Sequence, residues 1–178
     1  MTRMKAKAAM LAVVIGCAAL LAGDAKAQQA TLVDPLLDHM VGHWVLEGTI
    51  AGQKTTHDVE AEWVLAHQYL RFREVSREKD ERGRPAYEAE VYLGWDAKAK
   101  EYVCIWIDVW GGASAETIGR ATRRGSVLPF VFRDAGGAEA FHTTFLYDEK
   151  ADAWEWRLDN VDKGTEKPFA RVGLTRKK

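Results

Sequence analysis

The side chains of this sequence that are best suited to chemistry gather in one stretch, CIWIDVWGG at residues 104–112. Successive side chains of a β-strand point to opposite faces, so Cys104, Trp106, Asp108 and Trp110 would share one face of a strand. A carboxylate between two indoles is costly to bury unless a partner satisfies it. Asp108 could therefore anchor a ligand amine or hydroxyl, act as a general acid or base, or be a structural group held by a nearby backbone N–H or arginine.

Large aromatic side chains and one thiol are further candidates. Aromatic rings can stack on a flat ligand, although they fill the core of a small barrel equally well. The thiol of Cys104 is expected to be inert, because an apolar strand disfavours the reactive thiolate. The candidate lining of a binding site is therefore Trp63, Phe72, Cys104, Trp106, Asp108, Trp110 and Trp156.

Motifs of metal sites and common enzymes are missing from the sequence. The histidines show no two-apart or four-apart pairing with an acid that would form a metal site. There is no Gly-x-Ser-x-Gly turn, phosphate-binding loop or Gly-rich dinucleotide motif. We therefore expect no metal and assign no catalytic residue beyond the candidate Asp108. The histidines are His39, His43, His57, His67 and His142.

The first 27 residues have the features of a secretory signal peptide. Basic residues precede an apolar run over 8–23, and Ala25-Lys26-Ala27 resembles a cleavage site. We expect an exported protein, periplasmic or secreted, with a single domain over 31–178. The apolar run is short for a membrane span, and none is expected in the mature chain. The alternative is lipoprotein processing at Cys17, which would anchor the protein to a membrane.

Charge and cysteine content narrow the classes of partner. The whole chain has a formal net charge of −1, and removal of residues 1–27 leaves 21 Lys and Arg against 25 Asp and Glu, a net charge of −4. No basic patch indicates nucleic acid as a partner. Cys104 is then the only cysteine, so an internal disulfide is excluded. The fold must be held by packing, for which seven tryptophans supply apolar area.

The pattern from residue 43 onward predicts strands. Asp34-Pro35 is a helix N-cap and first turn, and the apolar residues that follow predict one short helix before Gly42. Short apolar segments separated by Gly-, Asp- and Lys-rich turns then predict an all-β, antiparallel, up-and-down barrel. The expected strands are 43–51, 54–65, 68–76, 85–95, 100–110, 114–122, 126–134, 140–148, 153–160 and 169–176.

Two similar hairpins fix which residues face each other. The turns WDAKAKEY at 95–102 and YDEKADAW at 147–154 predict that Asp96 pairs with Glu101 and that Asp148 pairs with Ala153. Pairing of Asp96 with Glu101 places Asp108 opposite Ala89, and directly opposite residues of two antiparallel strands lie on the same face of the sheet. The predicted cross-strand pairs are Leu93 with Cys104, Val91 with Trp106 and Ala89 with Asp108.

Charged rows on three neighbouring strands indicate which side is outside. We expect Arg71 to lie between Glu62 and Glu90, and an equivalent row to contain Glu60, Arg73 and Glu88. Such ladders are less costly in water than in a core. The opposite rows, including Trp63, Leu70, Phe72 and Asp108, should then face inward. The aliphatic row from Val103 to Val109 should face outward, covered by the N-terminal helix or by the second subunit of a homodimer.

The segment VGHWVLEG, with Gly42-x-Trp44 after a short helix, resembles the opening of calycin barrels such as lipocalins, fatty-acid-binding proteins and nitrobindin-like proteins. The middle of the chain, with EWVLAHQYLRFREV and VYLGWDAKAKEYVCIWID, most resembles a bacterial calycin-like family of unknown function. The resemblance covers about residues 36–176. It implies a barrel that binds a small apolar molecule, with Trp44 covered by a basic side chain from the last strand, either Arg171 or Arg176.

The nitrobindin branch of that group implies a haem, held by a histidine late in the chain. Only His142 is available, and its neighbours Phe141 and Thr143 belong to the opposite, aromatic row. His142 should therefore face outward, and we expect no haem.

Together these observations predict an exported lipocalin-like protein that binds a small apolar or amphipathic molecule in its lumen. One alternative is an enzyme that uses Asp108 as an acid or base in that cavity. The other is an interaction protein with a filled barrel that dimerises through the Val103–Val109 face.

Overall fold

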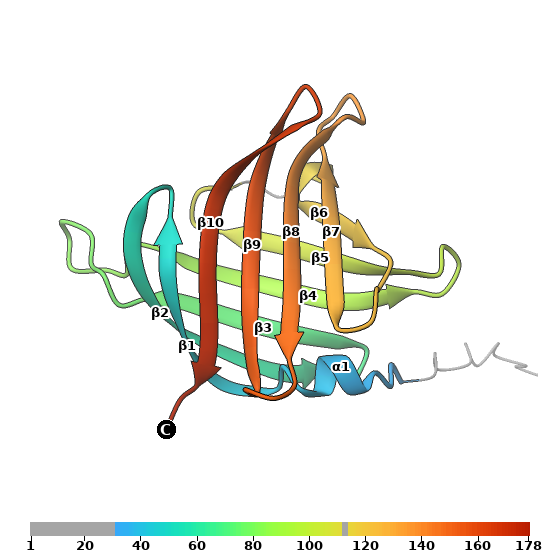
Figure 1. Cartoon of the computed structure of the whole chain (residues 1–178), viewed down its shortest axis with the longest axis horizontal. Helices are drawn as coiled ribbons and strands as arrows, with labels where there is room; N and C mark the ends of the chain where they lie inside the picture. The colour runs from blue at the N-terminus through green and yellow to red at the C-terminus, as the bar shows by residue number, and fades with distance from the viewer. Residues whose placement is uncertain (1–30, 112–113) are drawn as a thin grey trace, which may run out of the picture. The chain divides into compact units, whose positions relative to one another are not determined.

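The computed structural model describes residues 31–111 and 114–178, and these form an all-β barrel (Figure 1). Ten antiparallel strands pair in chain order, and β10 closes on β1. The predicted fold class is confirmed, and the closed barrel is consistent with a calycin-like fold. The elements are α1 (Pro35–Asp38), β1 (Gly42–Ile50), β2 (Gln53–Val64), β3 (Tyr69–Ser76), β4 (Glu88–Asp96), β5 (Glu101–Asp108), a 3₁₀ turn (Ala115–Thr117), β6 (Ile118–Ala121), β7 (Val127–Arg133), β8 (Glu139–Asp148), β9 (Ala153–Asp162) and β10 (Thr165–Arg176).

Two sequence predictions lie outside the described residues: the signal peptide over 1–27 and the lipid attachment at Cys17. Within 31–111 and 114–178, no helix has the length and apolar character needed to cross a membrane.

The two predicted hairpins have the predicted registers. Asp96 pairs with Glu101, so Ala89 faces Asp108 across β4 and β5. Asp148 likewise pairs with Ala153 across β8 and β9. Both turns begin with an aspartate whose side chain accepts hydrogen bonds from backbone N–H groups two and three residues ahead, which fixes the loop length. The row containing Cys104, Trp106 and Asp108 therefore faces the interior.

The predicted register between β3 and β4 is wrong by two residues. Arg73, not Arg71, faces Glu90, and Tyr92 lies opposite Arg71. Arg71 still contacts Glu62 on one side and reaches Glu90 only diagonally, at 3.9 Å. The loop over 77–87 is too long to fix a register, unlike the tight turn between β4 and β5. A shift of two residues leaves both arginines on the outer face, as predicted.

The half of the barrel next to α1 is filled by side chains. The side chains there are large and apolar, and they leave almost no accessible surface. Such packing supplies most of the apolar burial that stabilises the fold. It includes Leu37, Met40, Trp44, Leu70, Phe72, Leu93, Leu128, Phe130, Phe145 and Leu174.

Arg176 and Trp44 close this end. The Arg176 guanidinium carbon lies 3.9 Å from the centroid of the Trp44 ring, and the Trp44 indole donates to the Met40 carbonyl at 2.7 Å. Of the two arginines that the resemblance implied, Arg176 therefore covers the tryptophan. Arg171 instead pairs with Asp159 at 2.6 Å.

The aliphatic row on the outer face of β5 is not covered by α1. The buried residues of α1, Leu36 and Leu37, belong to the core at the barrel base. Ile107 is 42% exposed and Val109 is 56% exposed. The expectation that the N-terminal helix covers this row is therefore wrong for the described residues.

Candidate functional site

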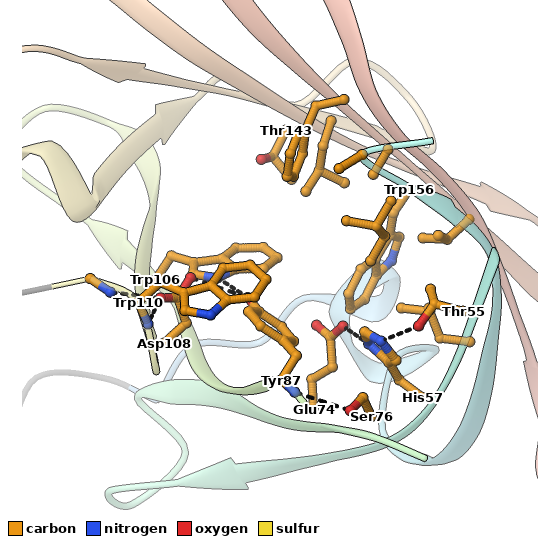
Figure 2. A pocket seen from close by; sticks show the side chains of 18 of the residues that line it. Thr55, His57, Glu74, Ser76, Tyr87, Trp106, Asp108, Trp110, Thr143 and Trp156 are labelled. Atoms are coloured by element: carbon orange, nitrogen blue, oxygen red, sulfur yellow. Dashed lines mark hydrogen bonds and ion pairs between the residues drawn. The ribbon is translucent and has the colours of Figure 1, made fainter. Parts of the chain in front are cut away.

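A cavity of about 800 Å³ occupies the half of the barrel that lies away from α1 (Figure 2). It opens between the β1–β2 turn, at Ala51 and Gln53, and the segment around Glu116 and Thr117. Most of its wall is apolar or aromatic, which suits a small apolar ligand.

The space exists because inward side chains become smaller or polar toward this end. Along β2 the inward row changes from Ala61 and Val59 to His57 and Thr55, and along β3 it changes from Phe72 to Glu74. Trp156, fully buried on β9, lies at the boundary between the two halves. It lines the cavity, and its ring packs 5.8 Å from Phe72 in the filled half.

One corner of the cavity is an aromatic cluster around Asp108. The Trp106 indole N–H donates to the Tyr87 hydroxyl at 3.0 Å, and that hydroxyl donates to Asp108 Oδ2 at 3.2 Å. Asp108 Oδ1 accepts from the backbone N–H groups of Trp110 and Gly111, at 2.8 and 2.9 Å. These four polar hydrogens are therefore directed at the Asp108 carboxylate or at the Tyr87 hydroxyl.

Trp110 departs from the predicted inward orientation. Strand β5 ends at Asp108, where the Asp108 side chain caps the following turn, so the alternation that would bury Trp110 stops. Trp110 is 70% exposed, yet its ring still contacts the Tyr87 ring, with centroids 4.8 Å apart. It therefore forms the rim of the cavity.

A buried histidine and glutamate face the same cavity. His57 and Glu74 are each 2% exposed, and His57 Nδ1 forms a very short hydrogen bond with Glu74 Oε1. His57 Nε2 lies 2.7 Å from the Thr55 hydroxyl, which donates to Glu78 at 3.0 Å. This chain of polar groups runs from the interior to the rim. Figure 2 shows it on a different side of the pocket from Trp106 and Trp110.

The hydrogen bonds also indicate the charge of the pair. Burial opposes ionisation of Glu78, but its own backbone N–H, the Thr56 N–H and the Thr55 hydroxyl outweigh it and lower its pKa. Thr55 therefore donates its one proton to Glu78 and accepts from His57 Nε2–H. One proton then remains between His57 Nδ1 and Glu74, so the His57–Glu74 pair is neutral overall wherever that proton resides.

Tyr87 connects the two polar groups. Its ring stacks on His57, with centroids 5.7 Å apart, while its hydroxyl bonds Asp108. Burial raises the pKa of Tyr87 far above its ordinary value, and the nearby Glu74 carboxylate adds to this effect. The hydroxyl thus stays protonated and remains a donor to Asp108.

Only part of the predicted lining surrounds the cavity. Trp106, Asp108, Trp110 and Trp156 do, but the other three residues lie outside it. Phe72 and Cys104 are buried in the core, where burial raises the pKa of the Cys104 thiol. Trp63 packs near the barrel base, where its indole donates to Asp38 at 2.8 Å and stacks on His67.

Comparison of the sequence with protein-family models and with curated proteins finds no match. The geometry of the cavity is therefore the basis for proposing a function.

His57, Glu74 and Tyr87 were missed by sequence reasoning, although a signal for them exists. Extending the inward row of β2 beyond Val59 by two residues gives His57, and the same step along β3 from Phe72 gives Glu74. Extending the row of Ala89 backward gives Tyr87. An acid and a histidine on the inner rows of adjacent strands indicate a buried pair.

His142 lies on the outer face of β8, between two carboxylates. Its Nδ1 is 2.7 Å from Glu166 and its Nε2 is 3.2 Å from Glu139. It does not line the cavity, so nothing places it at a lumenal haem. Across the described part of the chain, no three His, Cys, Asp or Glu side chains are grouped to hold a metal ion.

Proposed function

We propose that this protein is a lipocalin-like carrier or receptor that binds a small apolar or amphipathic molecule in its barrel. The observation that carries the proposal is the cavity of about 800 Å³, apolar over most of its wall and open at one end. Ligand pockets of this size and character bury most of a small molecule and use a few polar groups for orientation. The signal peptide predicted for residues 1–27 supports an activity outside the cytoplasm.

The binding groups differ by position within the cavity. Trp156 supplies an apolar floor, and Trp106 and Trp110 supply aromatic surface toward the rim. The polar groups are the Asp108 corner and the His57–Glu74 pair. An amphipathic ligand would place its apolar body against the floor and its polar group near the mouth.

The test is native mass spectrometry of the mature protein purified from the cell envelope, followed by analysis of small molecules released on denaturation. A co-purifying lipid, pigment or metabolite, lost in Trp106→Ala, is the expected result. The matched control is Trp95→Ala, since Trp95 does not line the cavity. A ligand-free mass that is unchanged by a panel of lipids would overturn the proposal.

An acid–base enzyme is the second candidate, and His57 favours it more than Asp108 does. The oxygens of Asp108 already accept three hydrogen bonds, which gives that carboxylate a structural use. His57 lies between Thr55 and Glu74. Because Thr55 donates to Glu78 and accepts from His57, a nucleophile–base–acid order requires that His57 Nε2 lose its proton and that the Thr55 hydroxyl turn toward it. This candidate predicts that p-nitrophenyl esters are hydrolysed and that His57→Gln abolishes turnover. Absence of turnover in the wild type would exclude this esterase activity.

The third candidate is a homodimer that forms through the aliphatic row from Val103 to Val109. Ile107 and Val109 are large apolar side chains in water. A dimer detected by light scattering and dissociated by Ile105→Asp would support this use. A monomer at all concentrations would remove it without affecting ligand binding.

A further inference from the structure

We infer that the ligand is an amphipathic amine whose cationic group lies at the Tyr87–Trp106–Trp110 corner, beside Asp108. This inference rests on the proposed function, because it names the chemical class of ligand for the same cavity. Three observations carry it: the use of the donors in the corner, the aromatic rings beside Asp108, and the charges around the mouth.

Four donors of the corner are already occupied. The Trp106 N–H and the Tyr87 O–H bond within the cluster, and the Trp110 and Gly111 backbone N–H groups bond Asp108. A ligand carboxylate or phosphate needs several donors, and among the described residues of the corner these bonds leave only the Trp110 indole N–H, at the exposed rim. What remains available is acceptor capacity on Asp108 Oδ2 and the faces of the rings.

Aromatic faces attract cations. The Tyr87 and Trp110 rings lie 4.8 Å apart at a tilt of 47°, and Trp106 contacts the same tyrosine through its indole N–H. The negative faces of several rings beside a carboxylate are the arrangement that recognises ammonium groups, including quaternary ones. Figure 2 shows Trp106 and Trp110 together beside Asp108 at this corner of the pocket.

The charges around the cavity point the same way. Because the His57–Glu74 pair is neutral overall, the remaining lining charges are the carboxylates of Glu78, Asp108 and Glu116 and the ammonium of Lys54. Lys54 is exposed at the start of β2, and the described residues that line the cavity include no arginine. The mouth therefore favours a cation over an anion.

The experiment compares four probes with the same twelve-carbon chain, each below its micellar concentration: dodecyltrimethylammonium, dodecylamine, 1-dodecanol and dodecanoate. Binding is followed by isothermal titration calorimetry and by tryptophan fluorescence. We expect both cations to bind at least about tenfold more tightly than 1-dodecanol, and dodecanoate to bind most weakly.

Two variants locate the cationic group. Asp108→Asn and Trp110→Ala should each reduce affinity for dodecyltrimethylammonium by a larger factor than affinity for 1-dodecanol. Trp110 is exposed, so its removal does not threaten folding. Val109→Ala is the matched control, because Val109 is an exposed neighbour that does not line the cavity.

The outcomes separate this inference from the proposed function. Equal affinity for all four probes, or tightest binding of dodecanoate, would overturn the cationic ligand while supporting an apolar binding cavity. An equal loss of affinity for the cation and the alcohol in Trp110→Ala would also overturn it, since Trp110 would then contact only the hydrocarbon chain of the probe. Failure of every probe to bind would overturn the inference and the proposed function together.

Discussion

Asp108 and Glu74 are two carboxylates inside the same barrel, and they are stabilised in different ways. Asp108 accepts two backbone N–H groups and one phenol, whereas Glu74 shares a proton with a single histidine. Asp108 Oδ2, which among the described residues accepts only the Tyr87 hydroxyl, therefore keeps some acceptor capacity, while Glu74 forms part of a neutral pair. This difference is why the corner at Asp108, and not the pair, is expected to attract a cation.

The buried pair can be tested by a double-mutant cycle. Glu74→Leu leaves His57 buried without its partner at Nδ1, so the free energy of unfolding should fall by about 3 kcal/mol. Glu74→Leu combined with His57→Phe replaces both groups with apolar side chains and should recover most of that loss. Urea denaturation of the four proteins measures the coupling. A double variant as unstable as the sum of the two single variants would contradict the pairing.

Thr143 shows the opposite situation, a buried polar atom without a partner. Its hydroxyl lies in the wall of the cavity, fully buried, and makes no hydrogen bond with any other described residue. Thr143→Val keeps the shape and removes the unsatisfied group, so the free energy of unfolding should rise by about 1 kcal/mol. Thr143→Ser, which keeps the hydroxyl, is the control. A fall of similar size in the valine variant, measured by urea denaturation, would show that the hydroxyl has a stabilising partner.

At the scale of elements, Asp34 attaches the helix to the barrel. Its carboxylate caps α1 by accepting the Leu36 N–H at 2.9 Å, and it also accepts from Arg123 and from the Tyr102 hydroxyl on β5. Such a cap is worth about 1 kcal/mol in a simple helix, and here it also bonds two distant parts of the barrel. One buried side chain thus fixes the short helix that covers the filled end.

The Tyr102–Asp34 contact predicts loss of stability in alkali. Burial raises the pKa of Tyr102 to about 12, and the Asp34 carboxylate adds to the shift, whereas an unfolded tyrosine ionises near pH 10. The folded state therefore favours the protonated phenol. The contribution of protonated Tyr102 to the free energy of unfolding is complete below about pH 10 and is lost as the pH rises from about 10 to 12.

Denaturation at a series of pH values tests this prediction against Tyr102→Phe. The free energy of unfolding of the wild type should fall more steeply above pH 10 than that of the variant. Because the pKa of Tyr87 is also raised by burial, some pH dependence should persist in Tyr102→Phe. Parallel curves for the two proteins would mean that Tyr102 ionises equally easily in the folded and unfolded states.

What could be predicted from the sequence depended on the connections between elements. The four-residue turns fixed the pairs Asp96–Glu101 and Asp148–Ala153, and through them the inward orientation of Asp108. The long loop over 77–87 imposes no comparable restraint, so the register of β3 with β4 was predicted two residues away from its position. The prediction of which side chains face inward was still correct, because a shift of two residues does not exchange the two faces of a strand.

The site was less predictable, because the alternation of a strand indicates which side chains face inward but not where along the barrel they lie. Trp63, Phe72 and Cys104 face inward, yet they lie in the filled half, whereas Trp156 reaches the cavity. Whether aromatic side chains fill or line a barrel depends on which neighbours are small, here Thr55 and Thr143, and on how the ten strands place them at the same level. That information is three-dimensional and is not contained in the pattern of any single strand.

At the scale of the whole molecule, the two ends of the barrel differ in structure: one is packed and the other is hollow. Helix α1 lies at one end of the barrel (Figure 1). That end is filled with side chains and closed by Trp44 and Arg176, while the other end contains the cavity. Closure of the barrel leaves no free sheet edge, and the packed end supplies most of the apolar burial. The fold therefore tolerates small and polar residues at the open end. Stability and ligand binding should therefore respond to different mutations.

Arg176 is the residue at which this separation can be tested. Its guanidinium lies over Trp44, donates to the Val41 and His39 carbonyls at 2.6 and 3.0 Å, and pairs with Asp152 at 2.9 Å. Arg176→Ala should lower the free energy of unfolding by about 2 kcal/mol, and Arg176→Lys should lower it less, because lysine keeps the charge without the planar fork. Urea denaturation gives both values.

The same variants should leave ligand affinity unchanged. None of the groups that Arg176 contacts lines the cavity, so the dissociation constant of 1-dodecanol measured on folded Arg176→Ala should equal that of the wild type. Trp106→Ala should show the reverse pattern, with weaker binding and a smaller effect on unfolding, because Trp106 lines the cavity and is only partly buried. If Arg176→Ala weakened stability and binding in proportion, the barrel would be responding as one unit, and the closed end would contribute directly to the shape of the cavity.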